Sequence, residues 1–163
     1  MAHVTVLNGP NLNLLGVREP EIYGHTTLAA IERSCREFAD YAGLTLDFLQ
    51  SNHEGALVDY IHQAREKSGA LIINPAGYSF TSVALFDALK TFGGPIIELH
   101  ISNIHARDEL HRHSILSAAA KAVICGLGPY GYVLALQAAA QALGRLPAQL
   151  PACLRESPGG SAP

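Results

Sequence analysis

The feature that most constrains the fold is a repeated alternation of strand-like and helix-like segments. Short, wholly apolar or alternating runs predict strands, and apolar residues at helical spacing predict helices between them. The expected strands span residues 3–7, 44–49, 70–73, 96–100 and 122–125, and the expected helices 28–42, 56–67, 82–91, 106–113 and 131–143. This order predicts an α/β fold in which a parallel sheet carries helices on both faces through right-handed crossovers.

Length and composition fit a single domain of this kind. The chain has 163 residues, of which 48% are hydrophobic, enough for a sizeable core. We expect residues 1–146 to form one α/β domain. Residues 147–163 are rich in Pro, Gly and Ser, a composition that cannot support a core, so we expect a mobile tail there.

Charge and cysteine content exclude several classes of function. A net charge of −3 with scattered Lys and Arg argues against a nucleic-acid partner. The apolar runs are shorter than the ~20 residues that a membrane span needs. The three widely spaced cysteines and the absence of a targeting segment favour a cytoplasmic protein with reduced thiols. The low charged fraction of 15% favours self-association.

Polar residues gather where the expected strands end. They are Asn8 and Asn11 after the first strand, Gln50–His53 after the second, Asn74 after the third, and Glu98 and His100 at the close of the fourth. Ligands of doubly wound sheets bind beyond the carboxyl ends of the strands. Strand-end loops are commonly polar, but this does not explain why a Glu and a His close an otherwise apolar strand.

Two other motifs are weaker. Gly126–Gly131 matches GxGxxG, but it lies in the last strand–helix unit, no acidic residue follows at the required distance, and Pro129 lacks a backbone N–H. A tight turn with close helix packing is therefore favoured over dinucleotide binding. The histidines near the fourth strand match no zinc-binding spacing, so we expect no metal.

The remaining polar residues point to proton transfer. Tyr23 lies five residues after Arg18 in a long loop over residues 8–25. A phenol with its ordinary pKa of ~10 is a poor base, but a nearby guanidinium favours the phenolate. Spacing alone favours a Tyr23 that merely packs its ring. His100 suits a general acid near neutral pH, and Glu98, on the same strand face, can orient it. From the residues alone, we infer an acid–base enzyme on a flavodoxin-like sheet.

Together these segments resemble the type II 3-dehydroquinate dehydratases, over about residues 4–143. The matching stretches are residues 8–12, 18–20, 22–24, 50–55, 73–75 and, most strongly, Glu98-Leu99-His100-Ile101-Ser102-Asn103-Ile104-His105-Ala106-Arg107. The resemblance implies a flavodoxin-like three-layer sandwich with a five-stranded parallel sheet. It also implies a lyase that converts 3-dehydroquinate to 3-dehydroshikimate by anti elimination, in the shikimate or quinate pathway and without metal or cofactor.

The resemblance also implies the roles of individual residues. Tyr23 abstracts the proton next to the ketone and Arg18 keeps it ionised. Asn11 holds a water that stabilises the enolate, an electrostatic contribution to catalysis. His100 protonates the departing hydroxyl, with Glu98 behind it.

Substrate binding and assembly follow from the same resemblance. Asn74 and the backbone N–H groups of Ile101 and Ser102 hold the substrate carboxylate. The loop with Arg18 and Tyr23 closes as a lid. Asp87 reaches the site of a neighbouring subunit in a homododecamer built as a tetramer of trimers.

The sequence departs from the family pattern near the substrate's ring hydroxyls. Phe80 stands where a His is usual, Phe86 where an Arg precedes Asp87, and His111 where an Arg grips substrate, with Arg112 next to it. The leading interpretation is an active dehydratase with an altered grip. The alternatives are a paralogue acting on a related cyclic hydroxy-keto acid and a weakly active binding homologue.

Overall fold

A five-stranded parallel sheet forms the centre of the computed structural model, which describes residues 2–145 apart from the side chain of Tyr23. The strands are β1 (Ala2–Asn8), β2 (Leu44–Gln50), β3 (Ala70–Asn74), β4 (Ile96–His100) and β5 (Ala122–Cys125). They lie in the order β2-β1-β3-β4-β5, and each neighbouring pair is parallel. The predicted flavodoxin-like architecture is confirmed.

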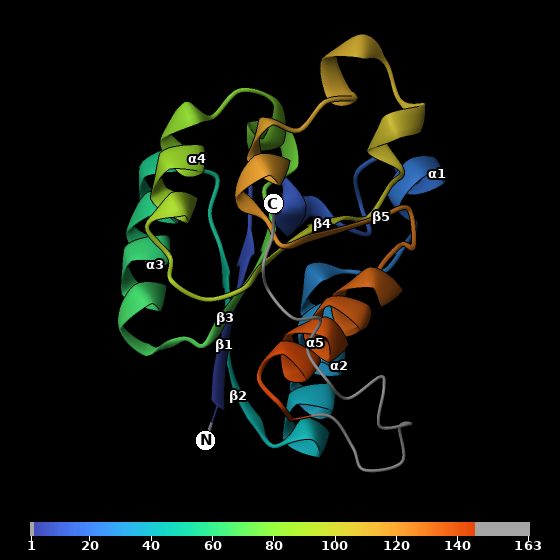
Figure 1. Ribbon diagram of the computed structural model, residues 1–163. Coiled ribbons are helices and arrows are strands. Elements are labelled where there is room, and N and C mark those ends of the chain that lie inside the picture. Colours follow the sequence, from blue (N-terminus) through green and yellow to red (C-terminus); the bar gives the residue numbers. More distant parts are fainter. Residues whose placement is uncertain (1, 146–163) are drawn as a thin grey trace.

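Two pairs of helices complete the three layers (Figure 1). The helices of the described chain are α1 (Pro20–Tyr23), α2 (Leu28–Ala42), α3 (Glu54–Lys67), α4 (Val83–Lys90) and α5 (Tyr130–Ala142). α2 and α5 cover one face of the sheet, and α3 and α4 cover the other. The Thr27 hydroxyl caps α2 by accepting the N–H of Ala30, and Gly43, at φ 67°, ends that helix in the left-handed region.

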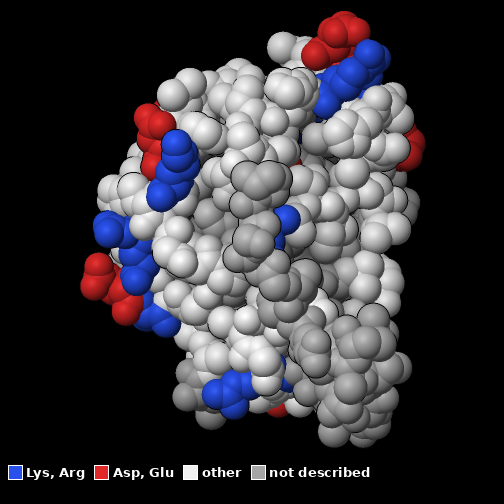
Figure 2. All heavy atoms as spheres, in the orientation of Figure 1, with Lys and Arg blue, Asp and Glu red and all other residues white. Residues whose placement is uncertain are grey.

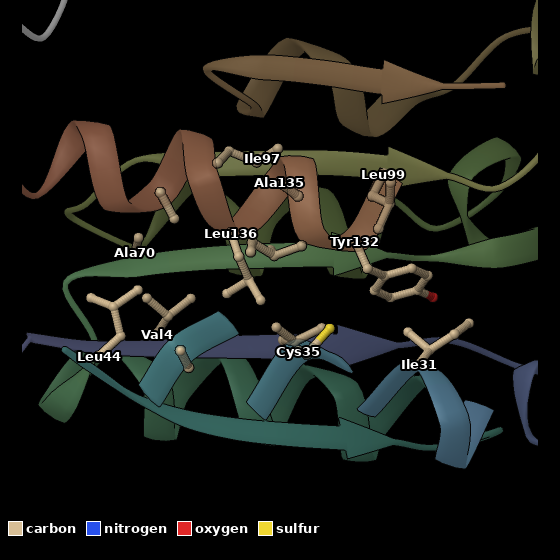
Figure 3. Packing of buried hydrophobic residues seen from close by; sticks show 14 of the residues in the cluster. Val4, Ile31, Cys35, Leu44, Ala70, Ile97, Leu99, Tyr132, Ala135 and Leu136 are labelled. Carbon is tan, nitrogen blue, oxygen red and sulfur yellow. The ribbon is translucent and has the colours of Figure 1, made fainter. Parts of the chain in front are cut away.

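Side chains of the buried strands belong to two apolar clusters, one on each face of the sheet. In β1, Val4 and Val6 belong to the cluster under α2 and α5, whereas Leu7 belongs to the cluster under α3 and α4. Figure 3 shows the first cluster, to which β1 contributes Val4 and α2 contributes Ile31 and Cys35. Residues of β1 and β3 are buried on both faces, as is typical of central parallel strands.

The segment after β4 differs from the sequence prediction. Instead of one helix over residues 106–113, it forms two 3₁₀ turns, η3 (Ile104–Ala106) and η4 (Glu109–His111). Asp108 causes the break, because its carboxylate accepts the N–H groups of Leu110 and His111 and so starts a new turn. The remaining 3₁₀ turns are η1 (Leu12–Leu14), η2 (Ala76–Phe80) and η5 (Ile115–Ala119). The predicted tail, 147–163, lies outside the described residues.

Charged side chains of both signs occur on the surface (Figure 2). On the face shown in Figure 2, Lys and Arg side chains lie beside Asp and Glu side chains. Among the described residues, none of the helices combines the length and apolar character that a bilayer span requires.

Candidate active site

A cavity of about 170 Å³ opens at the carboxyl ends of β1, β3 and β4. The predicted site residues that line it are Asn11, Arg18, Asn74, His100, Ile101, Ser102 and His111. The fold thus brings together residues far apart in the sequence, as expected for a doubly wound sheet. Asp87 is exposed on α4 and does not line this cavity, so its role in a neighbouring subunit stays a prediction. The side chain of Tyr23 lies outside the described part.

His100 is the buried titratable group that faces the cavity. Only 4% of the residue is exposed, because β4 runs through the centre of the molecule. Its Nε2 lies 3.5 Å from Oε2 of Glu98, an ion-pair distance, and has no hydrogen-bond partner among the described residues. That distance is at the limit of a hydrogen bond. The predicted pairing of Glu98 with His100 is therefore present, in a loose form.

Glu98 is fully buried, yet it is surrounded by donors. Its Oε1 accepts the hydroxyl of Ser114 at 2.5 Å and its Oε2 the hydroxyl of Ser117 at 2.5 Å. Burial alone raises the pKa of Glu98, but the His100 imidazole and the two hydroxyls outweigh it and hold the pKa below its ordinary value. Glu98 is thus an anion at neutral pH, placed behind the imidazole.

Asn74 is fixed by a buried hydrogen-bond network. Its Nδ2 donates to the Tyr132 hydroxyl at 3.0 Å, and that hydroxyl donates to Oδ1 of Asn8 at 2.7 Å. Oδ1 of Asn74 accepts the N–H of Ala76 at 3.3 Å. Burial raises the pKa of Tyr132, which keeps the hydroxyl a donor. These contacts settle the orientation of the Asn74 amide, and one of its N–H bonds remains for a ligand.

The GxGxxG turn supports the loop that follows β4. The N–H of Gly126 donates to the carbonyl of His100 at 3.3 Å, and the N–H of Gly128 donates to that of Ile101 at 3.0 Å. A Cβ on Gly131 would lie 2.9 Å from Cδ1 of Leu99, so α5 approaches the sheet closely there. The predicted tight turn with close helix packing is confirmed. The N–H groups of Gly126 and Gly128, which would have to face a bound phosphate, instead donate to backbone carbonyls.

The opposite wall comes from the segment between β1 and α2. Asn11 has φ 68°, and its N–H donates to Oδ1 of Asn52 at 3.0 Å. Gly9 allows the segment to cross Pro75, whose carbonyl oxygen a Cβ at Gly9 would meet at 2.4 Å. Arg18 pairs through Nε with Glu19 at 3.2 Å and is about half exposed. This wall therefore rests mainly on backbone contacts.

The wall expected to face the ring hydroxyls has a different chemistry. The ring of His111 meets that of Phe80 edge to face, with centroids 5.4 Å apart. Nδ1 of His111 lies 2.9 Å and 3.0 Å from the two oxygens of Asp108, and this bond holds the pKa of Asp108 below its ordinary value. Arg112 pairs instead with Glu109 at 3.1 Å and does not line the cavity.

Some site residues were not identified from the sequence. Arg107 lines the cavity, although the sequence placed it only within the strongest matching stretch. Ser114 and Ser117 hold Glu98, and Tyr132 holds Asn74, through contacts that no local pattern reveals. Within residues 2–145, no three His, Cys, Asp or Glu side chains are placed to hold a metal ion.

Comparisons with known proteins agree with this geometry. The family model described as dehydroquinase class II matches residues 2–140. The protein named 3-dehydroquinate dehydratase 1 of Agrobacterium fabrum is 54% identical over 135 residues, 83% of this chain and 93% of that protein. The type II dehydroquinase of Propionibacterium acnes has a TM-score of 0.83 and 43% identity, covering 86% of this chain and 97% of the other. That of Butyrivibrio crossotus has the same TM-score, 0.83, with 35% identity, covering 85% and 97%.

The family model spans β1 to α5, the elements that carry the cavity and the His100–Glu98 pair. The relatives span the same region at more than half identity, and the solved structures share its fold. Sequence, fold and the composition of the cavity therefore lead to one conclusion: the chain belongs to the class II dehydroquinase family.

Proposed function

We propose that this chain is a type II 3-dehydroquinate dehydratase, which converts 3-dehydroquinate to 3-dehydroshikimate in the shikimate pathway. The observation that carries the proposal is the buried His100, backed by ionised Glu98 and facing a cavity beside Asn74. The relatives named 3-dehydroquinate dehydratase support the substrate and the reaction. A part in quinate breakdown is compatible with the same chemistry.

The elimination proceeds through an enolate. The Tyr23 phenolate takes the proton next to the ketone, and the electrons of the broken C–H bond move to the carbonyl oxygen. Arg18 keeps Tyr23 ionised, and Asn11 holds a water that stabilises the enolate oxygen. The enolate then collapses and expels the hydroxyl, which leaves as water with the proton of His100. Both proton transfers are assigned to side chains, so no metal or cofactor takes part.

The substrate carboxylate is held by one end of the cavity. Asn74 offers an N–H, and the backbone N–H groups of Ile101 and Ser102 add two more donors. Two observations support this assignment: all three residues line the cavity, and the Asn74 amide is held in one orientation by Tyr132. His111 is assigned to the ring hydroxyls, beside Phe80.

We further propose that the enzyme works in the cytoplasm as a homododecamer, four trimers in which Asp87 reaches a neighbouring site. Exposed large apolar side chains support self-association; they include Val17 at 78%, Leu110 at 70% and Val83 at 63%. Cys35 and Cys125 are unpaired in the described chain, which suits a reducing compartment. Light scattering should report a large closed oligomer. A monomer at micromolar concentration would leave Asp87 with no site to reach.

A direct assay tests the activity. Purified protein is mixed with 3-dehydroquinate, and the ultraviolet absorbance of the conjugated enone product is followed. The wild type should produce the absorbance, and His100→Ala should lose at least about a hundredfold in rate, as is usual for removal of a general acid. Chelator treatment should leave the rate unchanged. No product from folded wild-type protein would refute the proposal.

A further inference from the structure

The Glu98 carboxylate is held by hydroxyl groups that the reaction itself does not use. Ser114 donates to Oε1 and Ser117 to Oε2, both at 2.5 Å. Ser114 is buried and Ser117 half-buried, and neither lines the cavity. Both come from the segment around η5, whereas Glu98 lies on β4. Two donors from a separate segment therefore bind both oxygens of one buried anion.

We propose that Ser114 and Ser117 are positioning residues that fix the Glu98 carboxylate and thereby hold the His100 imidazole in place for proton donation. The inference rests on the proposed function, since it takes His100 as the acid. It assigns a role to two residues that do not touch the substrate.

The distances indicate what sets the position of the carboxylate. The 3.5 Å contact between Glu98 and His100 is at the limit of a hydrogen bond and fixes no orientation by itself. The two hydroxyl contacts, at 2.5 Å, are in the range of strong charge-assisted bonds. Together they prevent rotation of the carboxylate about its own axis. The serines therefore determine where the negative charge lies, and the imidazole adjusts to it.

The local structure also fixes the hydroxyl of Ser114. Its oxygen accepts the N–H of Leu116 at 3.3 Å, the cap that starts η5. With that contact made, its proton is left for Glu98. The Ser114 hydroxyl thus connects η5 to Glu98 of β4, and the Ser117 hydroxyl makes a second hydrogen bond from η5 to the same carboxylate.

The hydrogen bonds from Ser114 and Ser117 to Glu98 should affect how the activity depends on pH. Burial is the largest influence on the pKa of Glu98 and raises it, and only His100, Ser114 and Ser117 oppose that effect. The other charged or titratable groups on the cavity side of His100 are Arg18, Arg107 and His111. Without the two hydroxyls the pKa of Glu98 rises, because two of the influences that lower it are lost, and Glu98 binds a proton at a higher pH. His100 then loses its anionic partner at a higher pH than in the wild type.

The test is the pH profile of a variant that carries Ser114→Ala and Ser117→Ala. At neutral pH its kcat should fall about tenfold or more, because two bonds to a charge are lost. The acidic limb of its kcat profile should move to higher pH. KM should change little, since neither serine lines the cavity. A merely structural role would not move the acidic limb.

Ser79→Ala is the matched control. Ser79 is fully buried, but its hydroxyl has no hydrogen-bond partner among the described residues. The control should keep the wild-type kcat and pH profile. If the double variant fails to fold, Ser117→Ala and Ser117→Thr replace it, and only Thr, which retains the hydroxyl, should preserve the profile. Wild-type kcat and an unmoved acidic limb in the folded variants overturn the inference.

A second readout separates this inference from the proposed function. Glu98 has a lowered pKa when folded, so its ionised form stabilises the wild type above the ordinary glutamate pKa of about 4.3. That stability is lost as the pH falls through the lowered value. In the double variant the pKa of Glu98 lies closer to the ordinary value, so the contribution of Glu98 should shrink and the unfolding midpoint in urea should fall less on acidification. Identical pH dependence of the two proteins contradicts the inference, even if neither is active.

Discussion

The two walls of the cavity are built in different ways. His100 and Asn74 come from the ends of β4 and β3 and are 4% and 3% exposed; Tyr132 holds the Asn74 amide, and Glu98 lies 3.5 Å from the His100 imidazole. Asn11 and Arg18 come from the segment between β1 and α2, are exposed, and depend mainly on backbone contacts. The wall with His100 and Asn74, the strand-borne wall, is thus buried at the end of the sheet, whereas the wall with Asn11 and Arg18, the loop-borne wall, is open to solvent.

The difference assigns separate tasks to the two walls. Donors fixed in advance stabilise developing charge without reorganisation, which suits the acid and the carboxylate site. An exposed segment can admit substrate and then close over it, which suits the base. Variants of the loop-borne wall should therefore change turnover while leaving stability unaltered. Variants of the strand-borne wall should change both.

The largest effect is expected at the base. Tyr23→Phe removes only the phenolic oxygen, so the protein should fold while the elimination rate drops by at least about a hundredfold. The ultraviolet assay and a circular dichroism spectrum measure the two properties. Tyr60→Phe, on α3 and outside the cavity, is the control. A folded Tyr23→Phe protein with full activity would exclude Tyr23 as the base.

A smaller loss is expected at Arg18. Arg18→Ala removes the positive charge assigned to the phenolate, so turnover at neutral pH should fall about tenfold and activity should appear only at higher pH. Arg18→Lys should restore part of the rate. Arg33→Ala, which removes an exposed arginine of α2, should have no effect. An unshifted pH profile in Arg18→Ala would show that Arg18 does not keep the base ionised.

Substitutions in the wall formed by Phe80 and His111 should raise the activity, whereas those at Tyr23 and Arg18 lower it. Phe80→His with His111→Arg adds donors where His111 is now bound to Asp108, so kcat/KM should rise about tenfold or more. The structure gives Arg112 no part in this wall, because it pairs with Glu109. An unchanged or lower kcat/KM would show that Phe80 and His111 already serve the substrate.

The smallest effect is expected at Tyr132, on the strand-borne wall. Tyr132→Phe leaves Asn8 and Asn74 short of a partner inside the protein, so the free energy of unfolding should fall by about 1–3 kcal/mol. KM should rise as the Asn74 amide becomes free to turn. Tyr41→Phe removes a hydroxyl from a residue that is 69% exposed and should change neither quantity. An equal loss of unfolding free energy in both variants would show that the hydrogen bonds of Tyr132 with Asn8 and Asn74 have no special role in stability.

Parts of this arrangement could be predicted because they depend on local pattern. The apolar runs predicted the strands, and parallel strands bring Asn74 and His100 to one edge whatever else the chain does. The contacts that hold these residues could not be predicted. Tyr132 and Asn8 are 124 positions apart, and Glu98 and Ser117 are 19 apart. The helix predicted over residues 106–113 was wrong because Asp108 caps a new turn, and its carboxylate outweighs helical propensity there.

The central claim is that the loop-borne wall removes the proton and the strand-borne wall expels the hydroxyl. Deuterium exchange tests it most directly: folded variants are incubated with 3-dehydroquinate in heavy water, and deuterium next to the ketone is measured by NMR against an enzyme-free control. His100→Ala should exchange that proton while forming little product, because Tyr23 still makes the enolate. Tyr23→Phe should do neither. Exchange by Tyr23→Phe and none by His100→Ala would contradict the claim.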